Sequence, residues 1–132
     1  MGDLGLDFDS SDARTWEPIM PPPVRDALER AITLLVAGRL DELEQLDEGG
    51  RMKADEWRQR IREYGRILVE PPSSDLDSAD VIPLKGSENE AWSVSYRLCT
   101  EQESKSDLML ELTVRYVGGD HVHIEVDDLR VA

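Results

Sequence analysis

Three stretches near the C-terminus alternate apolar and polar side chains with a period of two, which indicates β-strands with one buried face. They cover residues 92–98, 108–116 and 122–126. Such strands are typical of an antiparallel sheet that is covered on one side only. Residues 81–84 resemble a further short strand, which Pro83 would restrict to an edge of the sheet. We therefore expect a three- or four-stranded antiparallel meander.

Helical spacing of apolar residues comes before these strands. One amphipathic stretch begins near Pro23, a residue favoured in the first helical turn, and ends at Gly38. A short second helix follows with its leucines on one side, and a third is expected over residues 54–69, before Pro71. The sequence predicts an α+β fold with two to three N-terminal helices packed on one face of the sheet.

The length of 132 residues suits one domain. Residues 1–22 combine acidic residues with few apolar ones, so we expect a flexible N-terminal tail. The remaining residues, 23–132, are expected to form a single α+β domain. Within it we place helices in residues 23–70, a linker in residues 71–80 and the sheet in residues 81–131.

The strand register follows from the rule that directly paired residues share a face of the sheet. A three-residue loop, 118–120, with a left-handed residue at Gly119, pairs apolar with apolar residues in the last hairpin. The preceding hairpin pairs Leu98 with Leu108, and therefore Ser95 with Glu111. The pairs predicted for the last hairpin are Val114 with Ile124, Leu112 with Val126, Arg115 with His123, Thr113 with Glu125, and Glu111 with Asp127.

The chain carries a formal net charge of −14, and residues 71–132 hold 13 acidic and 5 basic residues. This charge disfavours nucleic acid and anionic membrane surfaces as partners, because both bind through Lys and Arg. A basic protein is the natural complement. The alternative is that the acidity only keeps the protein soluble.

Cys99 is the only cysteine, so an intrachain disulfide is excluded, which fits a reducing compartment. The first residues do not resemble a signal peptide. The longest apolar-rich run, residues 31–37, is far shorter than the ~20 residues that span a bilayer. We therefore expect the protein in the cytoplasm.

Metal and catalytic patterns are weak. His121, His123, Glu125 and Asp127 alternate along one strand, and imidazole with carboxylate can bind zinc. The same pattern is also that of a solvated strand face, which is the interpretation we favour. No nucleophile signature surrounds Cys99. We predict no metal, no cofactor and no enzymatic activity.

The open, polar face of the sheet is the predicted binding surface. A second hypothesis is a small pocket protein that uses Arg97, Arg115 and His123 inside a curved sheet. A third is that this face forms the seam of a homodimer. The predicted partner-binding residues are Glu111, Thr113, Arg115, His123, Glu125 and Asp127.

Several phrases carry a resemblance to a known family. They are Glu63-Tyr64-Gly65-Arg66 running to Pro71-Pro72, Trp92-Ser93-Val94, Ser106-Asp107-Leu108 with Leu110-Glu111-Leu112-Thr113-Val114, and Ile124-Glu125-Val126-Asp127-Asp128-Leu129. Together they resemble an uncharacterised family of small actinobacterial proteins, over roughly residues 24–131. The resemblance implies domain limits and no activity or cofactor. The acidic, cysteine-poor profile is also similar in type to bacterial toxin-immunity proteins.

Overall fold

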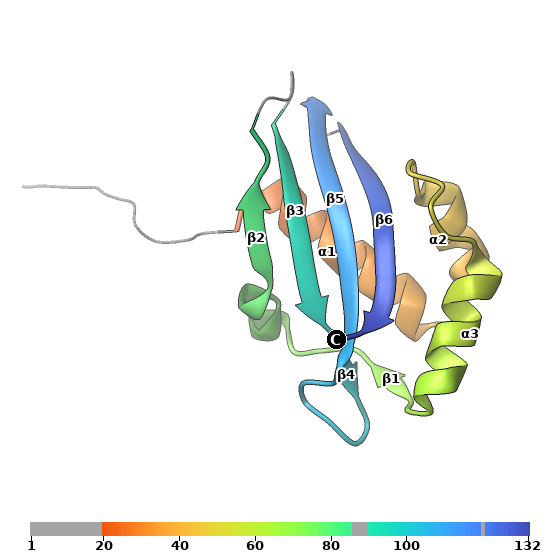
Figure 1. Ribbon diagram of the computed structural model, residues 1–132. Coiled ribbons are helices and arrows are strands. Elements are labelled where there is room, and N and C mark those ends of the chain that lie inside the picture. The colour runs from red at the N-terminus through yellow and green to blue at the C-terminus, as the bar shows by residue number, and fades with distance from the viewer. Residues whose placement is uncertain (1–19, 86–89, 120) are drawn as a thin grey trace, which may run out of the picture.

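The computed structural model describes residues 20–85, 90–119 and 121–132. Three α-helices come first, and a 3-10 helix, η1, lies between the first and second strands (Figure 1). The helices are α1 (Pro22–Val36), α2 (Leu40–Leu46), α3 (Ala54–Tyr64) and η1 (Ser73–Ser78). The strands are β1 (Leu68–Val69), β2 (Asp80–Pro83), β3 (Ala91–Arg97), β4 (Cys99–Thr100), β5 (Leu108–Gly118) and β6 (His121–Val131).

The main sheet has four antiparallel strands in the order β2-β3-β5-β6, with β2 at one edge. A second, two-stranded sheet pairs β1 with β4. Helix α1 crosses behind the main sheet, and α2 and α3 lie beside β6 (Figure 1). In the described part of the chain, no helix covers the other face of the sheet. This arrangement confirms the predicted α+β fold and the edge position of the strand that contains Pro83.

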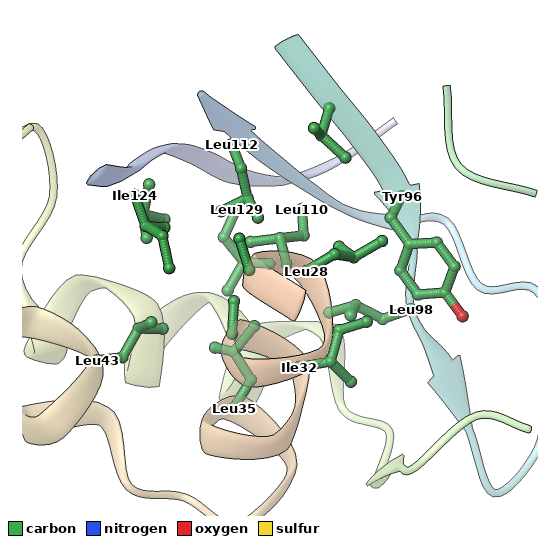
Figure 2. Packing of buried hydrophobic residues seen from close by; sticks show 14 of the residues in the cluster. Leu28, Ile32, Leu35, Leu43, Tyr96, Leu98, Leu110, Leu112, Ile124 and Leu129 are labelled. Atoms are coloured by element: carbon green, nitrogen blue, oxygen red, sulfur yellow. The ribbon is translucent and has the colours of Figure 1, made fainter. Parts of the chain in front are cut away.

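The hydrophobic core lies between α1 and the covered face of the sheet (Figure 2). Leu28 and Ile32 of α1 and Leu110 and Leu112 of β5 are all at most 1% exposed. Each such side chain contributes roughly 1.5–3 kcal/mol by leaving water. Because α1 has an apolar residue at every third or fourth position, these residues lie on one face of the helix and pack against the apolar residues of β5.

The predicted register holds in the centre of the sheet. Val114 pairs with Ile124, and Leu112 pairs with Val126. The polar pairs Arg115–His123 and Thr113–Glu125 also form as predicted. The preceding hairpin also has its predicted register, with Ser95 opposite Glu111 and the Leu98 N–H bonded to the Leu108 carbonyl at 3.0 Å.

Two details of the last hairpin were predicted wrongly, both because of register shifts. Glu111 pairs with Asp128, not Asp127, since β6 carries an extra residue at this point. A second shift near Val117 pairs Gly118 with His121, so Gly118 belongs to the strand and not to the loop. Gly119 does have the predicted left-handed conformation, with φ +59°.

The third helix is shorter than predicted. It ends at Gly65, whose φ of +76° is left-handed and whose N–H bonds the Ile61 carbonyl at 3.2 Å. The chain then becomes extended, so Leu68, expected on the helix, lies in β1 and is 8% exposed. The apolar stripe therefore continues into a strand, which periodicity alone did not reveal.

Residues 71–80 were expected to be a linker, and they contain η1, which buries Leu76 to 2% exposure. Most of the predicted N-terminal tail, residues 1–19, lies outside the described residues. Met20 is partly buried against the core, and the first helix begins at Pro22, one residue before its predicted start.

Candidate functional site

The uncovered side of the main sheet presents polar residues from three adjacent strands, and we call it the polar sheet face. Alternation along β3, β5 and β6 places them there, because side chains opposite the core-facing residues point away from the core. All six predicted partner-binding residues belong to strands β5 and β6. The polar sheet face comprises Ser93, Ser95, Arg97, Met109, Glu111, Thr113, Arg115, His123, Glu125, Asp127, Asp128 and Arg130.

The bulge in β6 brings two aspartates to this face. Thr113 Oγ1 donates a hydrogen bond to Asp127 Oδ2 at 2.6 Å, and Arg51 donates to Asp127 Oδ1 at 2.7 Å. Asp128 pairs across the strands with Glu111. Arg51 belongs to the loop between α2 and α3, so Asp127 ties that loop to the sheet. Strand alternation predicted that Asp127 lies on this face, but not that it bonds Arg51, which comes from a loop.

Opposite charges pair within the polar sheet face. Arg115 Nε lies 3.0 Å from Glu125, and Arg130 lies 2.8 Å from Glu111 and 3.5 Å from Asp128. The Glu125 and Asp127 side chains are only 17% and 19% exposed, so these pairs are partly shielded from water. The face is consequently a fixed pattern of both charges and not a uniformly acidic patch.

The two histidines lie in different settings. His123 is half-buried and pairs with Arg115 across the strands. His121 is exposed and lines a groove beside the start of α1. Within residues 20–85, 90–119 and 121–132, no three His, Cys, Asp or Glu side chains converge to hold a metal ion.

The residues of the pocket hypothesis do not line a pocket together. Arg97 pairs with Asp107 at 3.1 Å, and Arg115 with Glu125. Five grooves over the described residues have none of Arg97, Arg115 and His123 in their linings. We therefore find no observation that favours this alternative.

A second polar cluster joins η1 to the strands, and sequence reasoning missed it. The Tyr96 hydroxyl donates to Asp75 at 2.5 Å, and Lys105 Nζ donates to the same carboxylate at 3.1 Å. Cys99 Sγ lies 3.8 Å from the Tyr96 hydroxyl and donates to the Ser104 carbonyl at 3.0 Å. Strand alternation predicts Tyr96 on the apolar face, and composition predicts Asp75 in a linker, so no sequence signal connects the two residues.

The electrostatics of this cluster favour a structural role. Partial burial opposes ionisation of Asp75, but hydrogen bonds from Tyr96 and Lys105 outweigh it and lower the pKa of Asp75. Burial raises the pKa of the Cys99 thiol, and burial followed by the Asp75 bond raises that of Tyr96. A reactive cysteine needs a lowered pKa. The cluster therefore holds η1 and the 99–107 loop on the sheet.

In the described part of the chain, no helix is both long and apolar enough to cross a membrane.

Comparison with known proteins identifies the family. No curated protein and no solved structure matches the chain. A family profile matches residues 32–132, from the middle of α1 to the last residue. That range includes the whole main sheet and more than half of the chain. The chain therefore belongs to the family described as a domain of unknown function, DUF7668.

Proposed function

We propose that this chain is a non-enzymatic protein-interaction module that binds a basic protein through the polar sheet face. The observation that carries the proposal is the one-sided cover of the sheet, because helix α1 lies on the apolar face and no described helix lies on the other. A solvated sheet face with ordered side chains offers a partner a preformed surface, which lowers the entropy cost of binding.

The charge pattern supports a protein partner in particular. Ion pairs hold Glu111, Glu125 and Asp127 in place, so a partner would meet carboxylates at defined positions. The net charge of −14 would attract a basic protein over a longer range and speed the encounter. The ion-paired carboxylates would make binding specific, and the overall negative charge would raise the association rate.

The most concrete form of this proposal is an immunity-type inhibitor of a basic toxin in the bacterial cytoplasm. Inhibition by surface coverage needs no catalytic group on this chain. This mode of inhibition fits a chain whose single cysteine, Cys99, has a thiol with a raised pKa. The protein encoded by the neighbouring gene is the first candidate partner.

The test is a titration of the purified candidate partner against the full chain at several salt concentrations. We expect affinity to fall as salt rises from about 0.15 M to 1 M, where the Debye length shrinks from about 8 to 3 Å. Glu125→Lys should weaken binding by about tenfold or more, equal to roughly 1.4 kcal/mol. Glu29→Lys is the matched control, since Glu29 is exposed on α1, on the other side of the sheet.

Equal affinity at low and high salt, or equal binding by the two lysine variants, would contradict the proposal. Light scattering provides the remaining check. A dimeric mass that Glu125→Lys converts to a monomer would assign the polar sheet face to a second copy of this chain, and would also overturn it. Glu125→Lys breaks one ion pair, with Arg115, whereas reversal of Asp127 would break two bonds, to Thr113 and Arg51, so Asp127 is the poorer test position.

A further inference from the structure

A groove where α1 ends beside α3 and β1 differs from the rest of the surface, and we call it the basic groove. Its volume is about 340 Å³, and its walls are mostly apolar. Ile67 lies at this groove with 58% of its surface exposed. Its lining includes Leu35, Leu40, Arg58, Ile61, Arg66 and Ile67.

The charge of the basic groove is opposite to that of the protein. Two charged residues, Arg58 and Arg66, line the basic groove, and its lining contains no carboxylate. Arg58 is paired with Asp55 at 2.5 Å, whereas Arg66 forms no ion pair with any residue in the described ranges. Four other grooves of the described surface are each lined by two carboxylates: Asp26 and Glu48, Asp77 and Asp80, Glu29 and Glu70, or Asp26 and Glu29.

The N-terminal sequence has the complementary chemistry. Residues 3–9 read Asp-Leu-Gly-Leu-Asp-Phe-Asp, so apolar side chains alternate with carboxylates. Residues 1–19 contain five acidic residues and one basic residue. This segment lies outside the described residues. An apolar groove with arginines suits a peptide that carries Leu6 and Phe8 between aspartates.

The chain is long enough to reach. The described part begins at Met20, beside the start of α1, and Leu35 and Val36 at the far end of α1 line the basic groove. A 15-residue helix is about 22 Å long. The 12 steps from Phe8 to Met20 span up to roughly 40 Å when extended. The segment can therefore run the length of α1 with slack for bends.

We propose that residues 3–9 bind in the basic groove of the same molecule, with Leu6 and Phe8 against Ile61 and Ile67 and the aspartates beside Arg66. The N-terminal segment is then an internal ligand that covers the exposed apolar surface of Ile67. This inference concerns a surface away from the polar sheet face, so it does not depend on the proposed function.

Paramagnetic relaxation in the full chain tests the proposal. A nitroxide is attached to Ser10→Cys, and mass spectrometry confirms a single label, since Cys99 is 6% exposed. We expect the greatest loss of amide signal intensity at Ile61, Arg66 and Ile67, restored when ascorbate reduces the nitroxide. Ile67→Ser and Arg66→Glu should each reduce that loss. Ile82→Ser is the matched control, because Ile82 is 60% exposed and lies on β2.

Three outcomes would overturn the inference. One is a loss of intensity that is spread evenly over the surface, or strongest at another groove. Another is an equal effect of Ile67→Ser and Ile82→Ser. The last is the same pattern in a mixture of ¹⁵N-labelled protein with unlabelled, nitroxide-bearing protein, which would assign the groove to the N-terminal segment of a second copy. Both serine substitutions replace exposed side chains, so the fold should survive them.

Discussion

Asp47 Oδ1 accepts a hydrogen bond from the Val126 backbone N–H at 2.8 Å, across 79 residues of sequence. The same carboxylate accepts the Gly49 and Gly50 N–H groups at 3.0 and 3.1 Å. The neighbouring Glu48 N–H donates to the Ile124 carbonyl at 2.8 Å. The loop after α2 thus satisfies backbone groups at the open edge of β6, where an uncovered strand would invite pairing with another chain.

Removing this carboxylate should destabilise the protein. We expect Asp47→Ala to lower the free energy of unfolding by about 1.5–3 kcal/mol, the usual range for a hydrogen bond to a charged group. Urea unfolding followed by circular dichroism measures the change. Glu48→Ala is the control, because Glu48 bonds β6 through its backbone and should keep near wild-type stability. Equal stability of the two variants would show that the Asp47 side chain contributes nothing.

The contact between Asp47 and Val126 also marks a limit of sequence-based prediction. Alternation in β3, β5 and β6 was enough to predict the fold class and the central register, because each apolar residue must face the core. A bulge keeps the core residues Leu110 and Leu129 paired while it shifts Asp128 opposite Glu111. In the sequence, the shift is visible only as a wider spacing of apolar residues, because two residues and not one separate Val126 from Leu129.

The polar contacts of the candidate surface were harder to predict than its location. The polar sheet face followed from strand periodicity, and its six predicted residues do lie on adjacent strands. By contrast, Asp127 is bonded by Arg51 from a distant loop, and Asp75 lies in a 3-10 helix that is distant in sequence from its partner Tyr96. Side chains in such segments meet through tertiary packing, which local periodicity does not encode.

The Asp75 cluster should make stability depend on pH in the acidic range. The folded-state pKa of Asp75 is lowered, so its contribution is complete above the unfolded pKa of about 3.9 and is lost as pH falls through the folded pKa. Asp75→Asn should therefore be less stable than wild type at pH 7, by about 1–3 kcal/mol. The difference should shrink below about pH 4.

Urea unfolding of wild type and Asp75→Asn at both pH values provides the measurement. Tyr96→Phe serves as the control, because it removes one donor and leaves the Asp75–Lys105 ion pair at 3.1 Å. It should retain part of the pH dependence. A difference between wild type and Asp75→Asn that is the same at neutral and strongly acidic pH would contradict the assignment.

Gly65 should be important for the end of α3. Its φ of +76° places any L side chain in a strained, left-handed conformation, although a Cβ would meet no atom within 4 Å. Gly65→Ala should cost roughly 1–2 kcal/mol, and Gly65→Asn less, because asparagine tolerates this conformation better. Thermal unfolding would rank the variants. Arg66→Ala, at the exposed next position, should change stability little; a similar loss there would exclude backbone strain as the cause.

Cys99 should react slowly with alkylating reagents in the folded protein. It is 6% exposed, its Sγ donates to the Ser104 carbonyl at 3.0 Å, and burial raises the pKa of its thiol. Because the thiolate is the reacting form, both access and ionisation are reduced at neutral pH. Mass spectrometry after iodoacetamide treatment should show slow modification without urea and fast modification with it. Modification of the folded chain as fast as that of free cysteine would instead indicate an activated thiol, and would contradict the structural role of the cluster of Asp75, Tyr96 and Lys105.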